Sequence, residues 1–482
     1  MLPSSDNPAP APFTAQWAPC IHPGLIVDEA ARPALFLLHP REPRWALTNA
    51  SGLRMARRFD GTATLGALAG ETAAQHGISQ EHALGDLADF SRQLHDANLL
   101  QNLSLDTERT VRYVREPHRL TVYITEECNL RCRHCFVVEG KMPAPRLTGD
   151  DVRRLIDQHL ERFPGALVSF SGGEVFVRPD AMDLVRHAAG RAAEVSLNTN
   201  GLLIDSSIAA ELARLGVWVQ VSLDGADPEL HDFLRGPGTF EKAWSALQLL
   251  SDAGMASRTR TATTLTRCTV SQVRQLVERI EPLGLHEMRF LALNKMKAAV
   301  TNWGAIEPDP AELLDIYRYL LLELPFRQPP PRTRIQGDFP GFVPHRAPSV
   351  EHWCPLGETS IVDSQGHVYP CPTLLSPEYR TGNILDRPLA AIQDGTRARA
   401  LRATMVARQY VLPECRACAW RNFCQGGCQA FSQLRSGTPW ATDEFCGFRR
   451  ELYREYALRR SGGASPHTPA GPECSRTDSG AE

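Results

Sequence analysis

Three cysteines stand close together at Cys128, Cys132 and Cys135, in the spacing C-x3-C-x2-C. Three thiolates on one loop can hold three irons of a four-iron, four-sulfur cubane. Because no fourth cysteine lies nearby in the sequence, the fourth iron would stay open for another molecule, as a catalytic cluster requires. A structural zinc site is the alternative, and it fits this spacing poorly without a fourth ligand.

A second group of seven cysteines follows in the C-terminal part of the chain. Seven thiols exceed what a single four-ligand site can use, so the sequence indicates two metal centres. Zinc binding is the alternative here too, because Cys415 and Cys418 alone have the spacing of half a zinc knuckle. The seven are Cys354, Cys371, Cys415, Cys418, Cys424, Cys428 and Cys446.

Composition and charge limit the class of protein. The chain has 482 residues, 43% of them hydrophobic and 22% charged, with a formal net charge of -3. These values are typical of a globular protein, and they give no reason to expect a nucleic acid or a membrane as a partner. Residues 1–14 show no signal peptide, and no run approaches the roughly 18 apolar residues of a membrane span. We expect a cytoplasmic protein, in which clustered cysteines bind metal or do chemistry.

The elements that would position the first three cysteines alternate between strand and helix. Amphipathic stretches such as 150–163 and 270–280 separate short β-branched runs. This alternation predicts an α/β fold with a parallel sheet, open or closed into a partial barrel, whose sites lie at the carboxyl ends of the strands. Cys128 comes soon after the first strand. The expected strands are residues 120–125, 166–170, 194–197, 217–222, 258–265 and 287–291.

Glycine and polar residues follow the next three strands at the same edge. Close backbone approach needs glycine, and a carboxylate can bind an amine, although one such triplet alone would usually be only a turn. Signals at four successive strand ends, the cysteine loop included, are hard to produce by chance. The three further signals are Gly172-Gly173-Glu174, Asn198 with Asn200, and Ser222 with Asp224.

These motifs, with His134 and Phe136 beside the last cysteine, resemble the radical S-adenosylmethionine (SAM) superfamily. In that family the open iron chelates the amine and carboxylate of SAM, and one-electron reduction yields a 5′-deoxyadenosyl radical. The resemblance implies a partial (β/α)6 barrel over residues 116–325, with the catalytic [4Fe–4S] cluster on Cys128, Cys132 and Cys135. It further implies contacts to SAM from Gly172, Gly173, Glu174, Asn198, Asn200, Ser222 and Asp224.

The later cysteines, together with Gly382-Asn383-Ile384, resemble the SPASM domain, an extension of radical SAM enzymes that carries two auxiliary clusters. The resemblance implies a cluster-binding domain over residues 351–458, with one centre short of a cysteine ligand. Glu351 or His352 could supply that ligand, or the position could stay open for the substrate. One centre would use Cys415, Cys418, Cys424 and Cys446, and the other Cys354, Cys371 and Cys428.

One residue argues against a particular branch of this family. Pro372 stands where sulfatase-maturing relatives have an aspartate base. Because proline cannot act as a base, the resemblance does not extend to that chemistry.

The N-terminal part combines strands and helices, and Ser79 is the expected N-cap of its last helix. Residues 23–105 resemble the winged-helix-like module that binds leader peptides in ribosomal peptide maturation, as in the chaperone for pyrroloquinoline quinone. The resemblance implies that the leader of a precursor peptide adds a strand beside the sheet. The alternative is a domain that only packs on the barrel. The expected elements are strands at 34–38 and 45–47 and helices at 64–75 and 79–100.

The favoured function is radical modification of a ribosomally made peptide, giving a thioether, a carbon–carbon or carbon–oxygen crosslink, or an epimerised residue. Electrons would come from a reduced flavodoxin or ferredoxin. Two alternatives stay open: a protein side chain or a small molecule such as a tetrapyrrole as the substrate, and a non-catalytic metal-binding scaffold. Residues 1–22, 326–350 and 459–482 are expected to be a flexible start, a Pro-rich linker and a disordered tail. Cys20, Cys268 and Cys474 receive no role.

Overall fold

The computed structural model describes residues 11–103, 118–138, 146–191, 193–339, 342, 354, 356 and 359–460. The chain divides into two units, one of residues 1–108 with 450–482 and one of residues 109–449. Among the described residues, no helix is both long and apolar enough to cross a membrane.

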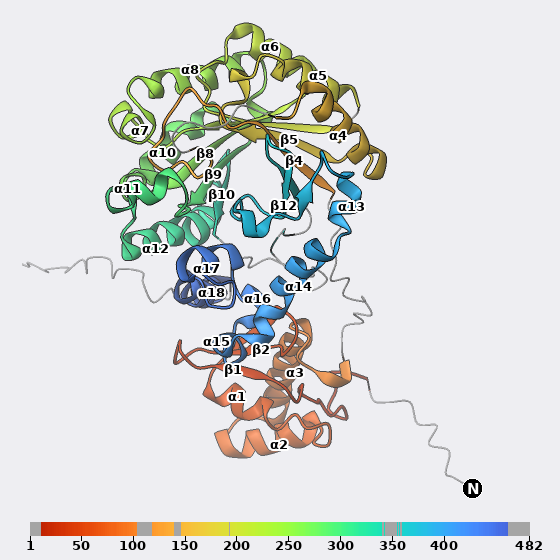
Figure 1. Cartoon of the computed structure of the whole chain (residues 1–482). Helices are drawn as coiled ribbons and strands as arrows, with labels where there is room; N and C mark the ends of the chain where they lie inside the picture. The colour runs from red at the N-terminus through yellow and green to blue at the C-terminus, as the bar shows by residue number, and fades with distance from the viewer. Residues whose placement is uncertain are drawn as a thin grey trace, which may run out of the picture. The chain divides into compact units, whose positions relative to one another are not determined.

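The N-terminal part of the first unit combines the helices α1 to α3 with a small antiparallel sheet of order β1-β2-β3 (Figure 1). Each helix begins at a polar N-cap, because Asn49, Thr64 and Ser79 each accept a backbone N–H through the side chain. The sequence does not predict the first helix, whose seven residues are too few to show a helical period. The elements are β1 (Ile26–Asp28), β2 (Leu35–Leu38), β3 (Trp45–Thr48), α1 (Ala50–Ala56), α2 (Leu65–His76) and α3 (Gln80–Asp96).

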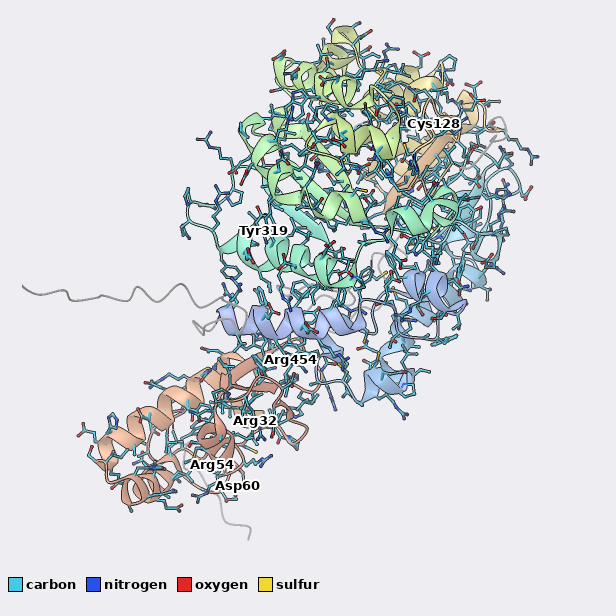
Figure 2. All side chains as sticks on the ribbon, turned by 90° about the vertical axis from the view of Figure 1, so that its left-hand side faces the viewer. Arg32, Arg54, Asp60, Cys128, Tyr319 and Arg454 are labelled. Atoms are coloured by element: carbon cyan, nitrogen blue, oxygen red, sulfur yellow. The ribbon has the colours of Figure 1, made fainter. Side chains whose placement is uncertain are left out.

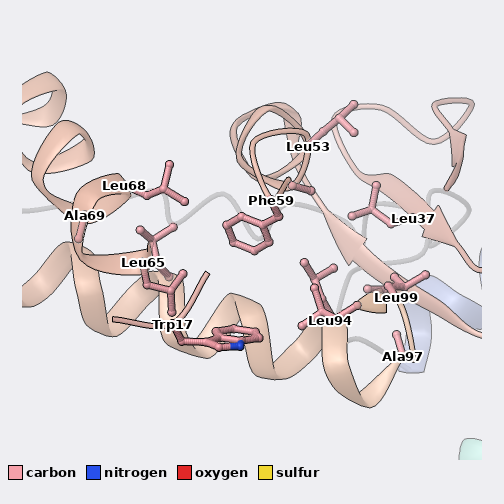
Figure 3. Packing of buried hydrophobic residues seen from close by; sticks show 14 of the residues in the cluster. Trp17, Leu37, Leu53, Phe59, Leu65, Leu68, Ala69, Leu94, Ala97 and Leu99 are labelled. Atoms are coloured by element: carbon pink, nitrogen blue, oxygen red, sulfur yellow. The ribbon is translucent and has the colours of Figure 1, made fainter. Parts of the chain in front are cut away.

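One hydrophobic core holds this unit together (Figure 3). Leu37 enters it from the sheet, Leu65 from α2 and Leu94 from α3, while Trp17 and Phe59 enter from loops. Burial of each such side chain contributes roughly 1.5–3 kcal/mol. The core therefore accounts for the stability of the unit more than its three short strands do.

The end of the chain also contributes to the first unit. Arg454 lies on the last helix, α18 (Cys446–Arg460), and is labelled in Figure 2. Its Nε donates to Oδ2 of Asp28 in β1 at 2.7 Å. Arg454 thus joins the last described helix to a sheet formed near the other end of the chain.

The second unit is built on a ten-stranded sheet that curves into a partial barrel (Figure 1). The strand order is β10-β9-β8-β7-β6-β5-β4-β11-β12-β13, and the two outer strands are not paired with each other. Strands β10 to β11 in this order are parallel, whereas β12 and β13 join antiparallel. The predicted α/β partial barrel is confirmed, with the expected strands as β4 to β9. The strands are β4 (Arg119–Thr125), β5 (Leu167–Gly172), β6 (Glu194–Thr199), β7 (Trp218–Ser222), β8 (Thr259–Leu265), β9 (Glu287–Ala292), β10 (Arg334–Asp338), β11 (Thr359–Val362), β12 (His367–Tyr369) and β13 (Gly382–Asn383).

Helices link the successive parallel strands and lie on the outer side of the sheet (Figure 1). Thr148, Asp205 and Asp227 cap α4, α6 and α7 by accepting backbone N–H groups, so these starts follow from the sequence. The helices up to the last parallel strands are α4 (Gly149–Arg162), α5 (Ala181–Gly190), α6 (Ser206–Leu215), α7 (Pro228–Arg235), α8 (Thr239–Asp252), α9 (Arg267–Val270), α10 (Val273–Ile280), α11 (Ala298–Ile306) and α12 (Pro310–Arg318).

The structure differs from the sequence prediction at residues 334–338, which form β10 instead of part of a linker. β10 pairs with β9, so that Arg334 lies opposite Glu287. Its sequence, Arg-Ile-Gln-Gly-Asp, lacks a regular apolar alternation, so pairing with the neighbouring strand decides its structure.

The cysteine-rich part continues the same sheet. β11 pairs with β4, the strand that precedes the cysteine loop, and β12 and β13 extend the edge. The remaining helices of this part are α13 (Leu389–Gln393), α14 (Thr396–Val411), α15 (Pro413–Arg416), α16 (Arg421–Cys424) and α17 (Gln429–Ser436).

Candidate active site

Cys128, Cys132 and Cys135 lie on the loop after β4 and line one cavity of about 600 Å³ (Cys128 is labelled in Figure 2). Burial raises the pKa of the Cys128 thiol, and it raises that of Cys132 to about 12, with the neighbouring thiols adding to both shifts. The backbone N–H of Arg133 donates to the carbonyl of Leu234 at 2.8 Å, which ties the loop to α7. The structure thus brings the three predicted cysteines together at the carboxyl end of the sheet.

Two glycines let the cysteine loop lie close to the end of β5. The N–H of Gly173 donates to the carbonyl of Thr125 at 2.8 Å, and that of Glu174 to the carbonyl of Glu127 at 2.9 Å. A Cβ on Gly172 would lie 2.2 Å from the Thr125 oxygen, and one on Gly173 would lie 2.0 Å from the Glu127 oxygen. A side chain at either residue would push the cysteine loop away, which explains why both positions need glycine.

Glu174 is fully buried and holds the end of β6. Its carboxylate accepts the Thr199 hydroxyl and the backbone N–H of Asn200, each at 2.7 Å. Asn200 in turn donates through Nδ2 to Oδ1 of Asn129 at 2.7 Å, and this Nδ2 lies 3.9 Å from the sulfur of Cys128. Burial raises the pKa of Glu174, against the effect of these hydrogen bonds. The carboxylate therefore positions a residue that faces the first cysteine.

Asp224 is also fully buried and connects two residues beside the cysteines. It accepts Nε of Arg235 at 2.5 Å and Nε2 of His134 at 3.1 Å. Burial opposes the charge of Asp224, but the positive charge of Arg235 and the interaction with His134 outweigh it and lower the pKa of the carboxyl. Nη1 of Arg235 lies 4.0 Å from the sulfur of Cys132.

The predicted SAM-contacting residues fall into two groups. The structure lines the cavity with the first group and keeps Glu174 and Asp224 behind its wall, with no exposed surface. The cavity-lining group is Gly172, Gly173, Asn198, Asn200 and Ser222.

A buried contact links the start of the cysteine loop to the turn between β11 and β12. Ser364 donates its hydroxyl to the carboxylate of Glu126, and its backbone N–H lies 3.3 Å from the same carboxylate. Burial raises the pKa of Glu126 to about 7. The Ser364 carbonyl accepts the backbone N–H groups of Arg146 and Leu147 at 2.9 and 3.0 Å. One turn of the cysteine-rich part thus helps to fix the loop that carries Cys128.

The later cysteines form two groups in space. Cys354 belongs to a buried hydrophobic cluster, and Cys371 and Cys428, both partly buried, pack against it. Burial, with Cys371 as the strongest charged neighbour, raises the pKa of Cys428 to about 12. These are the groupings that the resemblance implies. In the second group, burial raises the pKa of Cys415 to about 12, with further contributions from Cys424, Cys446 and Cys418.

Sequence reasoning does not identify the charged residues that support the cysteine-rich part. The N–H of Cys428 donates to Oδ2 of Asp443 at 2.6 Å, and Asp443 pairs with buried Arg449 at 2.7 Å. Arg408, also buried, donates to the carbonyls of Gly426 and Ala441 at 2.7 and 2.9 Å. Their burial among cysteines is a structural signal that the sequence spacing does not contain. The proposed ligands Glu351 and His352, and also Cys474, lie outside the described residues.

The chemistry of these thiols fits iron–sulfur clusters. Backbone N–H groups point at the sulfurs: Leu130 N lies 3.4 Å from Cys128, Val138 N 3.1 Å from Cys135. Such donors stabilise thiolates and tune the potential of a cluster. In the described part of the chain, no three His, Cys, Asp or Glu side chains converge as the ligands of a single metal ion do.

Three family models match successive parts of the chain. The model described as the radical SAM superfamily matches residues 122–280. The SPASM model, an iron–sulfur cluster-binding domain, matches residues 354–419. The model for coenzyme PQQ synthesis protein D matches residues 34–100.

Known proteins similar to this chain include a mycofactocin maturase and a heme synthase. Mycofactocin maturase MftC of Mycobacterium ulcerans is 30% identical over 343 residues, covering 67% of this chain and 85% of the relative. The AdoMet-dependent heme synthase of Oleidesulfovibrio alaskensis is 28% identical over 349 residues, covering 68% of this chain and 86% of the relative. The crystal structure of Streptococcus suis SuiB bound to precursor peptide SuiA has a TM-score of 0.57 at 15% identity, covering 89% of this chain and 99% of that one, and shows the same fold.

Proposed function

This protein belongs to the radical SAM superfamily and carries its SPASM extension, and on that premise we propose that its substrate is a ribosomally made precursor peptide. It is a radical SAM enzyme whose cofactors are SAM and iron–sulfur clusters. When bound, these cofactors supply reductive cleavage of SAM and abstraction of a hydrogen atom from the substrate. The product is then a peptide with a thioether, with a carbon–carbon or carbon–oxygen crosslink, or with one epimerised residue.

Some residues of the site would bind the cofactors, and others would position the residues that bind them. In this proposal Cys128, Cys132 and Cys135 hold the catalytic cluster, and polar residues of the cavity wall hydrogen-bond SAM. Glu174 and Asp224 act from behind the wall by holding Asn200, Arg235 and His134. The later cysteines hold the two auxiliary clusters. One cluster is held by Cys354, Cys371 and Cys428, and the other by Cys415, Cys418, Cys424 and Cys446.

The first unit carries the argument for a peptide. Residues 34–100 match the family of coenzyme PQQ synthesis protein D, and the unit has a small sheet whose outer strands, among the described residues, are β1 and β3. An extended leader can add to such an edge through backbone hydrogen bonds. We therefore assign leader binding to residues 23–105, the catalytic barrel to residues 116–325 and auxiliary-cluster binding to residues 351–458.

A small-molecule substrate is the second candidate, and the similarity to an AdoMet-dependent heme synthase favours it. A small molecule has no leader for the first unit to bind, so leader dependence separates the two candidates. In either case the proposed setting is the cytoplasm, with reduced flavodoxin or ferredoxin as the electron donor.

The test is anaerobic turnover of the full chain with a short peptide encoded beside its gene, with SAM and dithionite. We expect a SAM-dependent mass change in the core region of the peptide, and a rate at least about tenfold lower when the leader is removed. This factor corresponds to about 1.4 kcal/mol of binding free energy. Conversion of a porphyrin precursor, with the peptide unchanged, would overturn the proposal in favour of the second candidate.

A further inference from the structure

One side of the cavity beside the cysteine loop carries no predicted contact to SAM. The predicted SAM-contacting residues that line the cavity lie on or directly after β5, β6 and β7. The next two strands of the sheet, β8 and β9, line the same cavity (Figure 1). Because the substrate reacts with a radical formed from SAM, it has to lie beside SAM, and the side of β8 and β9 is where it has room. The residues that line this side include Ala262, Thr264, Leu291, Ala292 and Asn294.

Asn294 carries a polar group on this side, two residues after the end of β9. Its Oδ1 is buried and has no hydrogen-bond donor in the part of the chain that the structure describes. Among the described residues that line the cavity, no other side-chain oxygen is buried without a partner. A buried acceptor without a donor costs free energy, because its bond to water has been lost and not replaced. A ligand that donates an N–H group to this oxygen would offset that cost.

The backbone is held on both sides of Asn294. Before it, Leu293 packs in a buried cluster with Leu234 of α7. The carbonyl of Leu234 accepts the backbone N–H of Arg133 in the cysteine loop at 2.8 Å. After it, the backbone N–H of Met296 donates to the carbonyl of Asn294 at 2.8 Å. A side chain on a backbone that is already fixed loses little conformational freedom when it binds a ligand, so its contact adds to affinity.

An asparagine side chain has the same hydrogen-bonding groups as the backbone of a peptide. Its Oδ1 accepts and its Nδ2 donates, while each peptide bond offers one N–H donor and one C=O acceptor. A peptide presents this pair at almost every residue, whatever its side chains are. SAM also carries N–H donors, in its amine and in the amino group of its adenine, and is therefore the other source of a donor for Asn294.

We infer that the side-chain amide of Asn294 binds a backbone amide of the substrate peptide beside the catalytic centre. This inference rests on the proposed function, because it gives the core of the precursor peptide a contact in the cavity. The peptide is favoured over SAM because Asn294 follows β9, which lies two strands beyond the last predicted SAM contact on β7. A backbone contact does not depend on the side chains of the peptide, so it positions the core and leaves the choice of the reacting residue to other contacts.

Kinetics on the reconstituted holoenzyme test the inference. We expect N294A to raise KM for the precursor peptide about tenfold, because a hydrogen bond to the peptide is lost, and to leave the Kd for SAM within about twofold. The matched control is N302A, because Asn302 lies on α11, donates to the carbonyl of Ala298 at 2.8 Å and does not line the cavity. We expect N302A to leave both values unchanged.

Two outcomes of these measurements contradict the inference. An unchanged KM in N294A, with the peptide still modified, would overturn it and leave the proposed function standing. A weaker Kd for SAM with an unchanged KM for the peptide would assign Asn294 to SAM.

Precursor peptides N-methylated at one core residue at a time test the same contact on the unaltered protein. Each methyl group removes one backbone N–H donor. We expect one position at which the methyl group raises KM about tenfold in the wild type and less than about twofold in N294A, because the two changes remove the same hydrogen bond. A scan in which every position has the same effect on both proteins would refute the contact.

Two small probes decide the point without turnover. They are acetyl-glycine methylamide, which has two backbone N–H groups, and acetyl-sarcosine dimethylamide, which has none. Their binding to the SAM-loaded holoenzyme is followed by saturation-transfer NMR. We expect the wild type to bind the first probe about tenfold more tightly than the second, and N294A to abolish the difference. Equal binding of both probes by the wild type would refute the contact even if no peptide is ever found to be modified.

Discussion

Each thiol of the cysteine loop has a donor beside it, and these donors come from several parts of the fold. Cys128 lies near Nδ2 of Asn200, at the end of β6, and Cys132 lies near Nη1 of Arg235, at the end of α7. Cys135 receives a backbone N–H from the loop itself. The surroundings of the three thiols are thus fixed by residues that do not bind the cluster themselves.

The first prediction concerns Gly173. Replacement by alanine puts a Cβ 2.0 Å from the carbonyl oxygen of Glu127, a backbone atom that cannot move without moving the cysteine loop. We expect G173A to cost about 1–3 kcal/mol of stability and to lower the iron retained after reconstitution. Denaturant unfolding and iron analysis measure the two effects.

Gly190 provides the matched control, because a Cβ there meets nothing within 4 Å and the residue lies in α5. We expect G190A to be neutral or to stabilise the protein by up to about 1 kcal/mol. Equal iron content in G173A and the wild type would show that the glycine is not needed for the approach of the loop.

At the scale of the elements, strand ends are what the sequence predicts well. The carboxyl ends of parallel strands meet at one edge, so the order of strands along the chain is enough to place Gly172, Asn198 and Ser222 beside Cys128. Arg235 cannot be placed in this way, because it reaches Asp224 from the end of a helix 11 residues later, and a buried carboxylate requires a cation without specifying which one. The strand β10 is not predicted from the sequence either, because its structure depends on pairing with β9.

The second prediction concerns α4 and its buried His159. Burial lowers the pKa of this imidazole from 6.5 to about 4, so the folded protein keeps it neutral. Between these two values the unfolded chain binds a proton that the folded chain does not, and stability therefore falls as the pH falls below about 6.5. We expect wild-type stability to drop by about 1 kcal/mol more than that of H159L between pH 7.5 and 5.5.

Urea unfolding of the reconstituted proteins at matched pH values measures this difference. H82L is the control, because His82 is exposed on α3. If the wild type and H159L lose the same stability over this range, His159 is not a source of acid sensitivity.

At the scale of the whole molecule, the proposed leader binding and the proposed chemistry fall in different units. The sheet continues from β10 to β13, so the barrel and the strands of the cysteine-rich part belong to one compact unit. The module that matches coenzyme PQQ synthesis protein D belongs to the other unit, together with the chain from Arg450 onward. A fold divided in this way can hold the leader in one unit while the core of the peptide reacts in the other.

The last prediction is the metal content of the full chain after anaerobic reconstitution. One catalytic and two auxiliary [4Fe–4S] clusters give about twelve irons and about twelve sulfides per chain. Replacing Cys128, Cys132 and Cys135 by alanine should leave about eight irons and abolish cleavage of SAM after dithionite reduction. Replacing Cys415 and Cys418 by alanine should also remove about four irons, but SAM cleavage should persist while peptide modification is lost, because the thiols of the catalytic loop are untouched. Zinc in place of iron, with no SAM cleavage by the wild type, would contradict the enzymatic role of both cysteine groups.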